Sequence, residues 1–228
     1  MFEESFADRQ AAGRALASRL SALKGRAGAM VLALPRGGVP VGYEVARALE
    51  MPLDVFVVRK LGVPGREEYA MGAIAGGGVR VVDGEVCRVL GISEAQLEEV
   101  ARREQKELER RERLYRGNAP ALALRERTIV LIDDGLATGS TMHAAVLAAR
   151  LHDPSRIVVA APVASRDACA RLRAVADDVV CVATPAHFHA VGQWYADFSQ
   201  TGDDEVQALL ARAREERAAR PAGPDDSA

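Results

Sequence analysis

The sequence predicts an α/β fold in which a doubly wound parallel sheet carries helices on both faces. Short apolar runs alternate with amphipathic segments along most of the 228 residues, as in strand–helix–strand units. One apolar run, Ile129–Ile132, leads directly into Asp133 and Asp134 and then into a hydroxyl-rich turn. Ligands bind at such places in open α/β sheets, outside the carboxyl ends of the strands. With 49% hydrophobic residues, the chain can bury the core of one domain.

The individual elements follow from hydrophobic periodicity and from Gly and Pro breakers. Before the central motif we expect, in order, a helix over 3–24, a strand over 29–34, a helix to about Leu49, a strand over 53–58, a long Gly-rich charged loop over 59–78, a strand over 79–83 and a helix over 93–115. After it we expect a helix over 141–151, a strand over 156–161, a helix over 166–175, a strand over 178–183, a final helix over 203–217 and a frayed tail over 218–228.

The helix over 93–115 is strongly charged. Ser93 is its predicted N-cap, with Gln96 as the capping-box partner. Its apolar positions are few, and charges of both signs alternate along it. This pattern favours a solvated surface helix with internal ion pairs, and a dimer contact or a lid is the alternative.

Composition excludes several function classes. The net charge of −2 gives no electrostatic support for non-specific nucleic-acid binding. Cys87, Cys169 and Cys181 are far apart in sequence and have apolar neighbours, which indicates reduced thiols in a cytoplasmic protein. No apolar run approaches the length of a membrane span, and the acidic N-terminus is atypical of a signal peptide.

The central motif combines two chemistries. Ionised Asp133 and Asp134 only accept hydrogen bonds, so they suit hydroxyl groups. The turn 137–141 offers N–H and O–H donors at a helix start, which suits a phosphate. A ribose 5-phosphate would satisfy both halves, whereas the simpler alternative is a strand–turn–helix with a capping aspartate. The segment is not a Walker loop, because it lacks the Gly-x-x-x-x-Gly-Lys pattern.

The segment Ile129–Thr141 resembles the phosphoribosyl-pyrophosphate (PRPP) motif of the type I phosphoribosyltransferases. The resemblance extends over about residues 25–185 and implies that family's core fold with a small C-terminal hood. It implies that Asp133 and Asp134 hold the ribose hydroxyls and Mg²⁺, directly or through water. The 5-phosphate would be held by the loop residues Ala137, Thr138, Gly139, Ser140 and Thr141.

Two further segments match the expected pyrophosphate site. Pro35-Arg36-Gly37-Gly38 follows the first predicted strand, where the family binds pyrophosphate, sometimes with a cis peptide; a tight turn with a surface arginine is the alternative. Arg59 and Lys60 end the next strand and suit the same leaving group. The family closes a mobile loop at about this place, and the matching stretch here is 61–72. The residues expected to take part in catalysis are Lys60, Arg66, Glu68 and Tyr69, with a plain exposed loop as the alternative.

The aromatic segment near the C-terminus is the expected acceptor site. Residues 184–202 would form the hood over a core of about 25–183, in one domain that covers residues 1–217. The candidates for contact with a planar base are His187, Phe188, His189, Trp194 and Tyr195. The alternatives are that Trp194 and Phe198 anchor the last helix, and that the two histidines make structural contacts; with no third ligand nearby, a metal is disfavoured.

These expectations describe a Mg²⁺-dependent phosphoribosyltransferase of nucleotide salvage that uses PRPP and a nitrogenous base. Ala137 stands where the 6-oxopurine enzymes have an aspartate, so hypoxanthine and guanine are disfavoured acceptors. A PRPP-sensing regulator without catalysis is the second hypothesis, and a phosphoester hydrolase with Asp133 as nucleophile is the third. The resemblance to the family, whose members are usually dimers, implies a possible homodimer. We expect no nucleic-acid or membrane partner.

Overall fold

Five parallel strands form the central sheet in the order β2-β1-β6-β7-β8, in a computed structural model that describes residues 5–219. The prediction of a parallel α/β sheet is confirmed. The strands are nearly continuous apolar runs because helices cover both faces. Their bounds are β1 Ala29–Ala33, β2 Leu53–Val55, β6 Thr128–Ile132, β7 Arg156–Val163 and β8 Asp178–Ala183.

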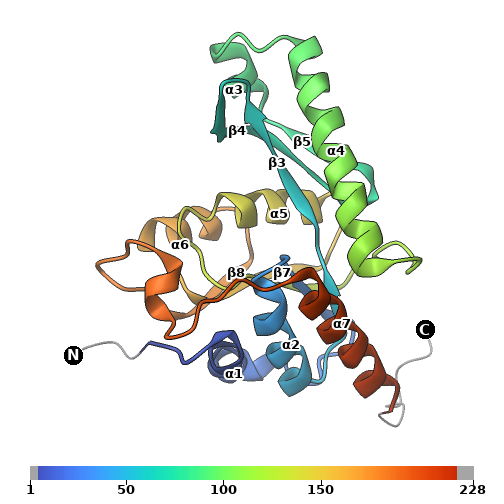
Figure 1. The fold of residues 1–228 in the computed structure, drawn as a ribbon, viewed down its shortest axis with the longest axis vertical. Helices are drawn as coiled ribbons and strands as arrows, with labels where there is room; N and C mark the ends of the chain where they lie inside the picture. The colour runs from blue at the N-terminus through green and yellow to red at the C-terminus, as the bar shows by residue number, and fades with distance from the viewer. Residues whose placement is uncertain (1–4, 220–228) are drawn as a thin grey trace.

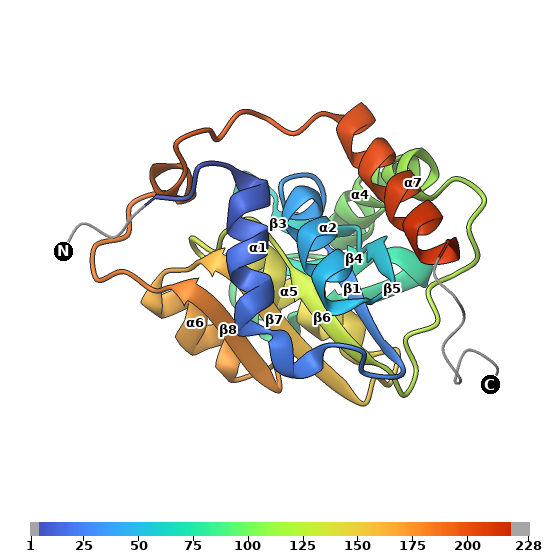
Figure 2. The same ribbon diagram turned by 90° about the horizontal axis from the view of Figure 1, so that it is seen from below.

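Two helical layers enclose the sheet (Figures 1 and 2). On one face lie α1, α2 and α7, and on the other lie α5 and α6. The bounds of these helices are α1 Arg9–Arg19, α2 Gly38–Leu49, α5 Ser140–Arg150, α6 Arg166–Arg173 and α7 Asp203–Ala218. Short 3₁₀ turns are η1 Ser21–Leu23, η2 Gly76–Gly78 and η3 Val191–Trp194.

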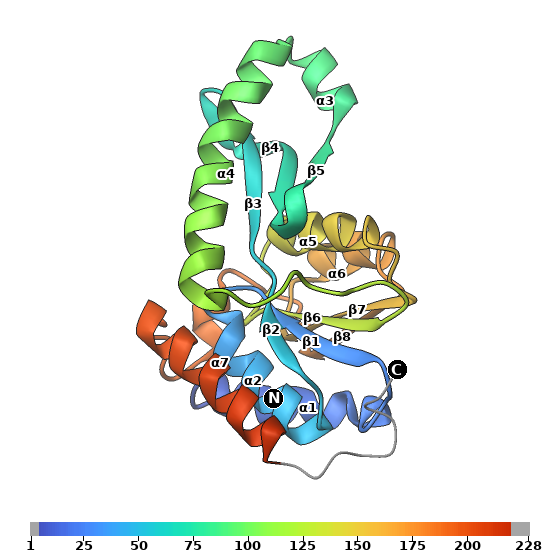
Figure 3. The same ribbon diagram turned by 90° about the vertical axis from the view of Figure 1, so that its right-hand side faces the viewer.

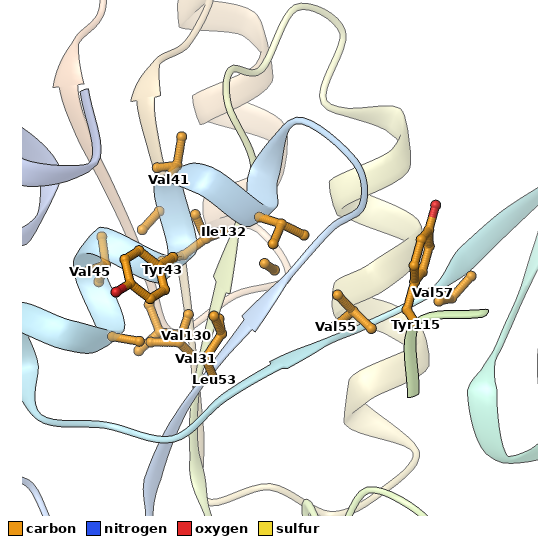
Figure 4. Close-up of a cluster of buried hydrophobic side chains, with 14 of the residues drawn as sticks. Val31, Val41, Tyr43, Val45, Leu53, Val55, Val57, Tyr115, Val130 and Ile132 are labelled. Carbon is orange, nitrogen blue, oxygen red and sulfur yellow. The ribbon is translucent and has the colours of Figure 1, made fainter. Parts of the chain in front are cut away.

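The core on the α2 face continues from the sheet to a helix outside it. Figure 4 shows Val31 and Val130 of the strands in one cluster with Tyr43 and Val45 of α2, while Tyr115 lies beside Val57 at the other side of the view. One contiguous apolar cluster therefore extends from the sheet to the helix that carries Tyr115, and apolar side chains of the sheet and of this helix are buried in it.

An arm rises from the edge of the core (Figures 1 and 3). The prediction of a loop over 59–78 was wrong here, because that stretch forms most of an antiparallel sheet in the order β3-β4-β5. Glycines in the strands obscured the pattern: a Cβ added at Gly72 would lie 2.4 Å from the carbonyl oxygen of Val81 on the paired strand. The bounds are β3 Val58–Val63, β4 Arg66–Ala75, β5 Val79–Val82, α3 Gly84–Val89 and α4 Glu94–Arg116.

Helix α4 is the packing helix of this arm. The predicted capping box of Ser93 and Gln96 is present. Its sparse apolar side chains, including Val100 and Leu108, are buried in the same cluster as Leu61 of β3. The other side carries the predicted ion pairs, among them Glu107 with Arg110 and Arg111, which lower the pKa of Glu107 to about 2.

Because Leu108 is only 1% exposed, we expect Leu108→Ala to lower the free energy of unfolding by about 2–4 kcal/mol. Leu90→Ala is the matched control, since Leu90 is 38% exposed, and it should cost well under half as much. Urea unfolding of both variants measures the difference. Equal losses would show that α4 contributes no more to the core than an exposed leucine does.

The ends of the chain differ in detail from the prediction. Helix α1 begins at Arg9, with Asp8 as its N-cap, so residues 5–8 precede the helix. Residues 1–4, which include the start of the predicted helix, and residues 220–228 of the predicted tail lie outside the described residues. Among the described residues no helix is long and apolar enough to cross a membrane.

The three cysteines are free thiols. Cys169 and Cys181, which are separated in sequence, come together between α6 and β8 with their sulfur atoms 3.7 Å apart. Burial raises the pKa of Cys181 to about 12, so this thiol is protonated and weakly reactive at neutral pH. Among the described side chains of residues 5–219, which do not include that of Glu68, no group of three or more potential metal ligands occurs.

Candidate functional site

The predicted site residues of β1 and β6 meet at the carboxyl edge of the sheet. Ala33 pairs with Ile132 in the parallel register, so the residues that follow each strand are neighbours. The contact is close: a Cβ at Gly37 would lie 2.0 Å from Oδ2 of Asp134, and a Cβ at Gly38 would lie 2.7 Å from the carbonyl oxygen of Ile132. Both glycines are therefore required for the first loop to lie against the acid pair.

The two aspartates occupy a desolvated position. Burial raises the pKa of Asp133 well above its usual range, and the neighbouring Asp134 raises it further. Burial also raises the pKa of Asp134, against the opposing effect of Arg9, whose Nε donates to Asp134 Oδ2 at 2.8 Å. The pair is thus short of hydrogen-bond donors, and it would be stabilised by ligand hydroxyls or a cation.

The loop after the acids runs into the N-terminus of α5. Gly139 has a φ of 69° as the N-cap residue, and a Cβ there would lie 3.1 Å from Ala168 Cβ. Helix α5 begins at Ser140, one residue before the predicted start. Thr138 Oγ1 lies 3.1 Å from Ser140 Oγ, so two hydroxyls and the first N–H groups of the helix gather at one place. This arrangement is suited to an anion.

The first loop carries Arg36. The Pro35–Arg36 peptide is cis. The guanidinium of Arg36 lies 3.7 Å from Asp203, the first residue of α7, and both side chains are partly exposed. Asp203 also accepts a 2.6 Å hydrogen bond from the hydroxyl of Tyr115, and burial with this bond raises the pKa of Tyr115 to about 12. One acid thus links the first loop, α7 and the arm.

The arm carries the other predicted cations and the catalytic candidates. Arg59 is paired with Glu104 of α4 at 2.5 Å, and Lys60 follows it on β3. Arg66 and Tyr69 are exposed at the beginning of β4, next to the hairpin turn. The turn lines a cavity of about 320 Å³ together with the first half of α4, at the end of the arm that points away from the sheet (Figure 3). The side chain of Glu68 lies outside the described residues.

The hood segment crosses the same sheet edge. Tyr195 is buried, with its ring 5.6 Å from that of Phe6, and its hydroxyl donates to the backbone oxygen of Asp134 at 2.5 Å. Phe188 and Trp194 pack against the small cluster around Tyr195. His187 and His189 are exposed. Tyr195 is therefore an anchor of the hood, and the exposed ring side chains of the hood are those of His187, His189 and Phe198.

Comparison with known proteins decides the family. The model of the family described as "Phosphoribosyl transferase domain" matches residues 4–198. The chain belongs to the phosphoribosyl transferase domain family.

Close relatives agree with this assignment. Two Mycobacterium tuberculosis proteins, from strains CDC 1551 and H37Rv, are each 50% identical over 91% of this chain and are named "Putative phosphoribosyl transferase". The chain spans 47% of the length of each. The crystal structure of TT1426 from Thermus thermophilus is 44% identical, with a TM-score of 0.83 over 91% of this chain and 98% of that one.

Sequence analysis did not identify several contacts that support the loop after the acid pair in this phosphoribosyl transferase domain. Ser165 caps α6 and its hydroxyl donates to the carbonyl of Ala137 at 2.7 Å. Arg171 of the same helix donates to the carbonyl of Thr138. Helix α6 therefore holds the phosphate-type loop in place. Of these, only Ser165 was recognisable in principle, as a polar residue after the apolar run of β7.

The acid pair of the phosphoribosyl transferase domain also leads to a pH-dependent stability. Because the pKa of Asp133 is raised on folding, the folded state binds its proton more readily than the unfolded state. The stabilisation that comes from the proton on Asp133 is fully present below pH 3.8, the ordinary pKa of an aspartate. It is lost as the pH rises through the higher pKa of Asp133 in the folded state. Asp133→Asn removes the buried charge, so we expect it to raise the free energy of unfolding by about 1 kcal/mol at pH 8.

The advantage of Asp133→Asn over the wild type should shrink steadily as the pH is lowered toward 4. Thermal unfolding of both proteins over pH 4–8 measures it. A variant that is equally stabilised at every pH would contradict a raised pKa at Asp133.

Proposed function

We propose that this protein transfers the 5-phosphoribosyl group of PRPP to a nitrogenous base with release of pyrophosphate. The observation that supports it best is the meeting of three groups at one sheet edge. These are the acid pair Asp133–Asp134, the hydroxyl-rich start of α5 and the loop of Arg36, Gly37 and Gly38. A hydroxyl acceptor, an anion site and a cation on a glycine loop correspond to the ribose, the 5-phosphate and the pyrophosphate of one substrate.

In this proposal each group contributes position or charge. Asp133 and Asp134 accept from the ribose 2- and 3-hydroxyls and orient the sugar. The 5-phosphate takes its donors from residues 137–141, and Arg36 offsets the charge that develops on the leaving pyrophosphate. Asp203 holds Arg36 before substrate arrives and is displaced by the stronger anion, since their separation of 3.7 Å is already long.

The acid pair fits a magnesium ion as well. Two carboxylates with raised pKa values are hard oxygen ligands in need of positive charge, and Mg²⁺ usually keeps waters and substrate oxygens for its other positions. When bound, the ion would neutralise the pyrophosphate of PRPP. Asp133 and Asp134 would hold it, directly or through water.

The acceptor would approach from the hood. His187, His189 and Phe198 are accessible there, whereas Tyr195 is occupied by its hydrogen bond to Asp134. Ala137 offers no carboxylate to a 6-oxopurine, so the proposal favours another base. Pyrophosphate release from PRPP and Mg²⁺, measured with a panel of purine and pyrimidine bases, tests the proposal. Release that depends on one class of base supports it, and release without any acceptor or none at all opposes it.

A PRPP sensor is the second candidate. The pairing of Arg59 with Glu104 favours it, because a predicted pyrophosphate cation is engaged within the arm. Tyr69, a predicted catalytic residue, is 56% exposed near the hairpin turn, and this position also favours the sensor. Saturable PRPP binding without turnover for any base in the panel would favour the sensor over the transferase.

A further inference from the structure

A single arginine from the N-terminal helix lies on the acid pair of the proposed PRPP site. Arg9 is only 11% exposed and Asp134 only 15%, and their 2.8 Å contact joins residues 125 positions apart. Asp133 does not share this partner: its Oδ1 accepts instead from the backbone N–H of Asp134. The two neighbouring carboxylates therefore have different environments.

The same guanidinium also binds the hood. Its Nη1 donates to the carbonyl of Ser199 at 2.6 Å, and its central carbon lies 4.0 Å from the ring centre of Phe198. Phe198 in turn packs on Tyr195 with 5.0 Å between ring centres. Arg9 thus reaches the acid pair with one nitrogen and the hood with another.

Backbone pairing fixes the segment that carries Arg9. The N–H of Phe6 donates to the carbonyl of Trp194, and the N–H of Ala196 donates back to Phe6, both at 2.8 Å. The N–H of Asp197 donates to the carbonyl of Ala7 at 2.9 Å. Residues 6–9 and 194–199 are consequently held together by backbone hydrogen bonds, and the side chain of Arg9 connects them to Asp134.

We propose that Arg9 is a positioning residue that holds Asp134 Oδ2, leaves Oδ1 for the ribose, and makes ribose recognition depend on the hood. The inference rests on the proposed function for its ligand, but its effect on Asp134 exists without any ligand. A guanidinium is suited to the task, since its planar fork can bind a carboxylate and a carbonyl together while its face stacks on an aromatic ring.

The charges around Asp134 make the role measurable. The groups that face it are Asp133 from the same strand end, Arg9 from α1 and Tyr195 from the hood, and Asp197 faces Arg9 from the far side. Arg9 is the group among them that favours the ionised carboxylate. Without Arg9, Oδ2 of Asp134 would lose the 2.8 Å contact that fixes it, and a double-mutant cycle of the two residues measures that contact without ligand.

Three variants test the proposal. Arg9→Gln removes the charge, Arg9→Lys keeps the charge but not the fork, and Arg14→Gln is the matched control on the same helix. Arg14 is 54% exposed and lies 3.6 Å from Glu44, away from the acid pair. Two readouts are needed: the coupling of Arg9→Gln with Asp134→Asn in urea unfolding without ligand, and the affinities for PRPP with Mg²⁺ and for pyrophosphate with Mg²⁺ by calorimetry at pH 8.

We expect Arg9→Gln and Asp134→Asn to be non-additive: Arg9→Gln should destabilise the Asp134→Asn protein less than it destabilises the wild type, with Arg9→Lys between Arg9→Gln and the wild type. PRPP affinity should fall at least about 10-fold in Arg9→Gln, whereas the affinity for pyrophosphate, which has no ribose, should change much less. Arg14→Gln should match the wild type in both.

The unliganded readout separates this inference from the proposed function. Additive effects of Arg9→Gln and Asp134→Asn on unfolding would overturn the role of Arg9, whether or not PRPP binds. An equal loss of affinity for PRPP and for pyrophosphate, together with a lower melting temperature, would also overturn it, because Arg9 would then serve the fold alone. If the wild type binds no PRPP while the two substitutions are still coupled, Arg9 positions Asp134 but the substrate assignment fails.

Discussion

Replacing Asp133 and Asp134 together by asparagine should abolish detectable binding of PRPP with Mg²⁺. Each ionised carboxylate accepts charge-assisted hydrogen bonds in the proposed complex, and each such bond is worth roughly 1.5–3 kcal/mol. An asparagine retains the shape and one acceptor but loses the charge that a magnesium ion requires. The expected loss of affinity is at least about 100-fold, which titration calorimetry measures directly.

Protein stability provides the control for this double variant. Burial raises the pKa of both acids and so disfavours their ionised forms, and their neutral replacements should therefore leave the protein folded at pH 8. Asp153→Asn, at the opposite end of the sheet after α5, is a variant outside the site and should bind as the wild type does. Retained affinity in the double variant would exclude this sheet edge as the PRPP site.

Gly37→Ala should weaken both the fold and the site. The added Cβ would lie 2.0 Å from Oδ2 and 2.6 Å from Cγ of Asp134, and 3.3 Å from Nε of Arg9. Atoms cannot approach so closely, so either the loop or the Arg9–Asp134 pair must move. Overpacking of this kind costs about 1–3 kcal/mol of stability. Because the displaced carboxylate is the proposed ribose acceptor, PRPP affinity should fall at least about 10-fold.

Gly84→Ala is the matched control, since a Cβ there meets nothing within 4 Å and its φ is not in the left-handed region. It should be neutral or slightly stabilising, and it should not change affinity. Denaturant unfolding and calorimetry of both variants make the comparison. A Gly37→Ala variant with wild-type stability and affinity would mean that Asp134 moves aside freely, so that its position matters little to the ligand.

Local chemistry explains why much of the site could be predicted from sequence. Asp133, Asp134 and the loop to Thr141 follow one another directly, so their strand–turn–helix geometry needs no information from elsewhere in the chain. Arg36 and its glycines follow a second apolar strand, and parallel pairing of the two strands brings their ends together. Residues that follow neighbouring parallel strands are brought to one edge by the topology alone.

Long-range pairing explains what was missed. Residues 59–78 contain glycines and charges, which indicate a loop, yet Gly62 and Gly72 allow the close strand approach on which the arm depends. Arg9 lies in the predicted N-terminal helix, where no local pattern marked it as part of the site. Its role becomes visible only because the hood segment 194–199 returns across the chain and meets residues 6–9.

Periodicity and contiguous motifs were enough to predict the α/β class, the family and the two loops that meet at the sheet edge, because each of these depends on residues that are adjacent in the sequence. The antiparallel arm and the hood anchored through Tyr195 became known only from the folded chain. The same holds for the pairing of Arg9 with Asp134. Each of these depends on partners far apart in the chain, whose contact is set by packing and desolvation that no local pattern records.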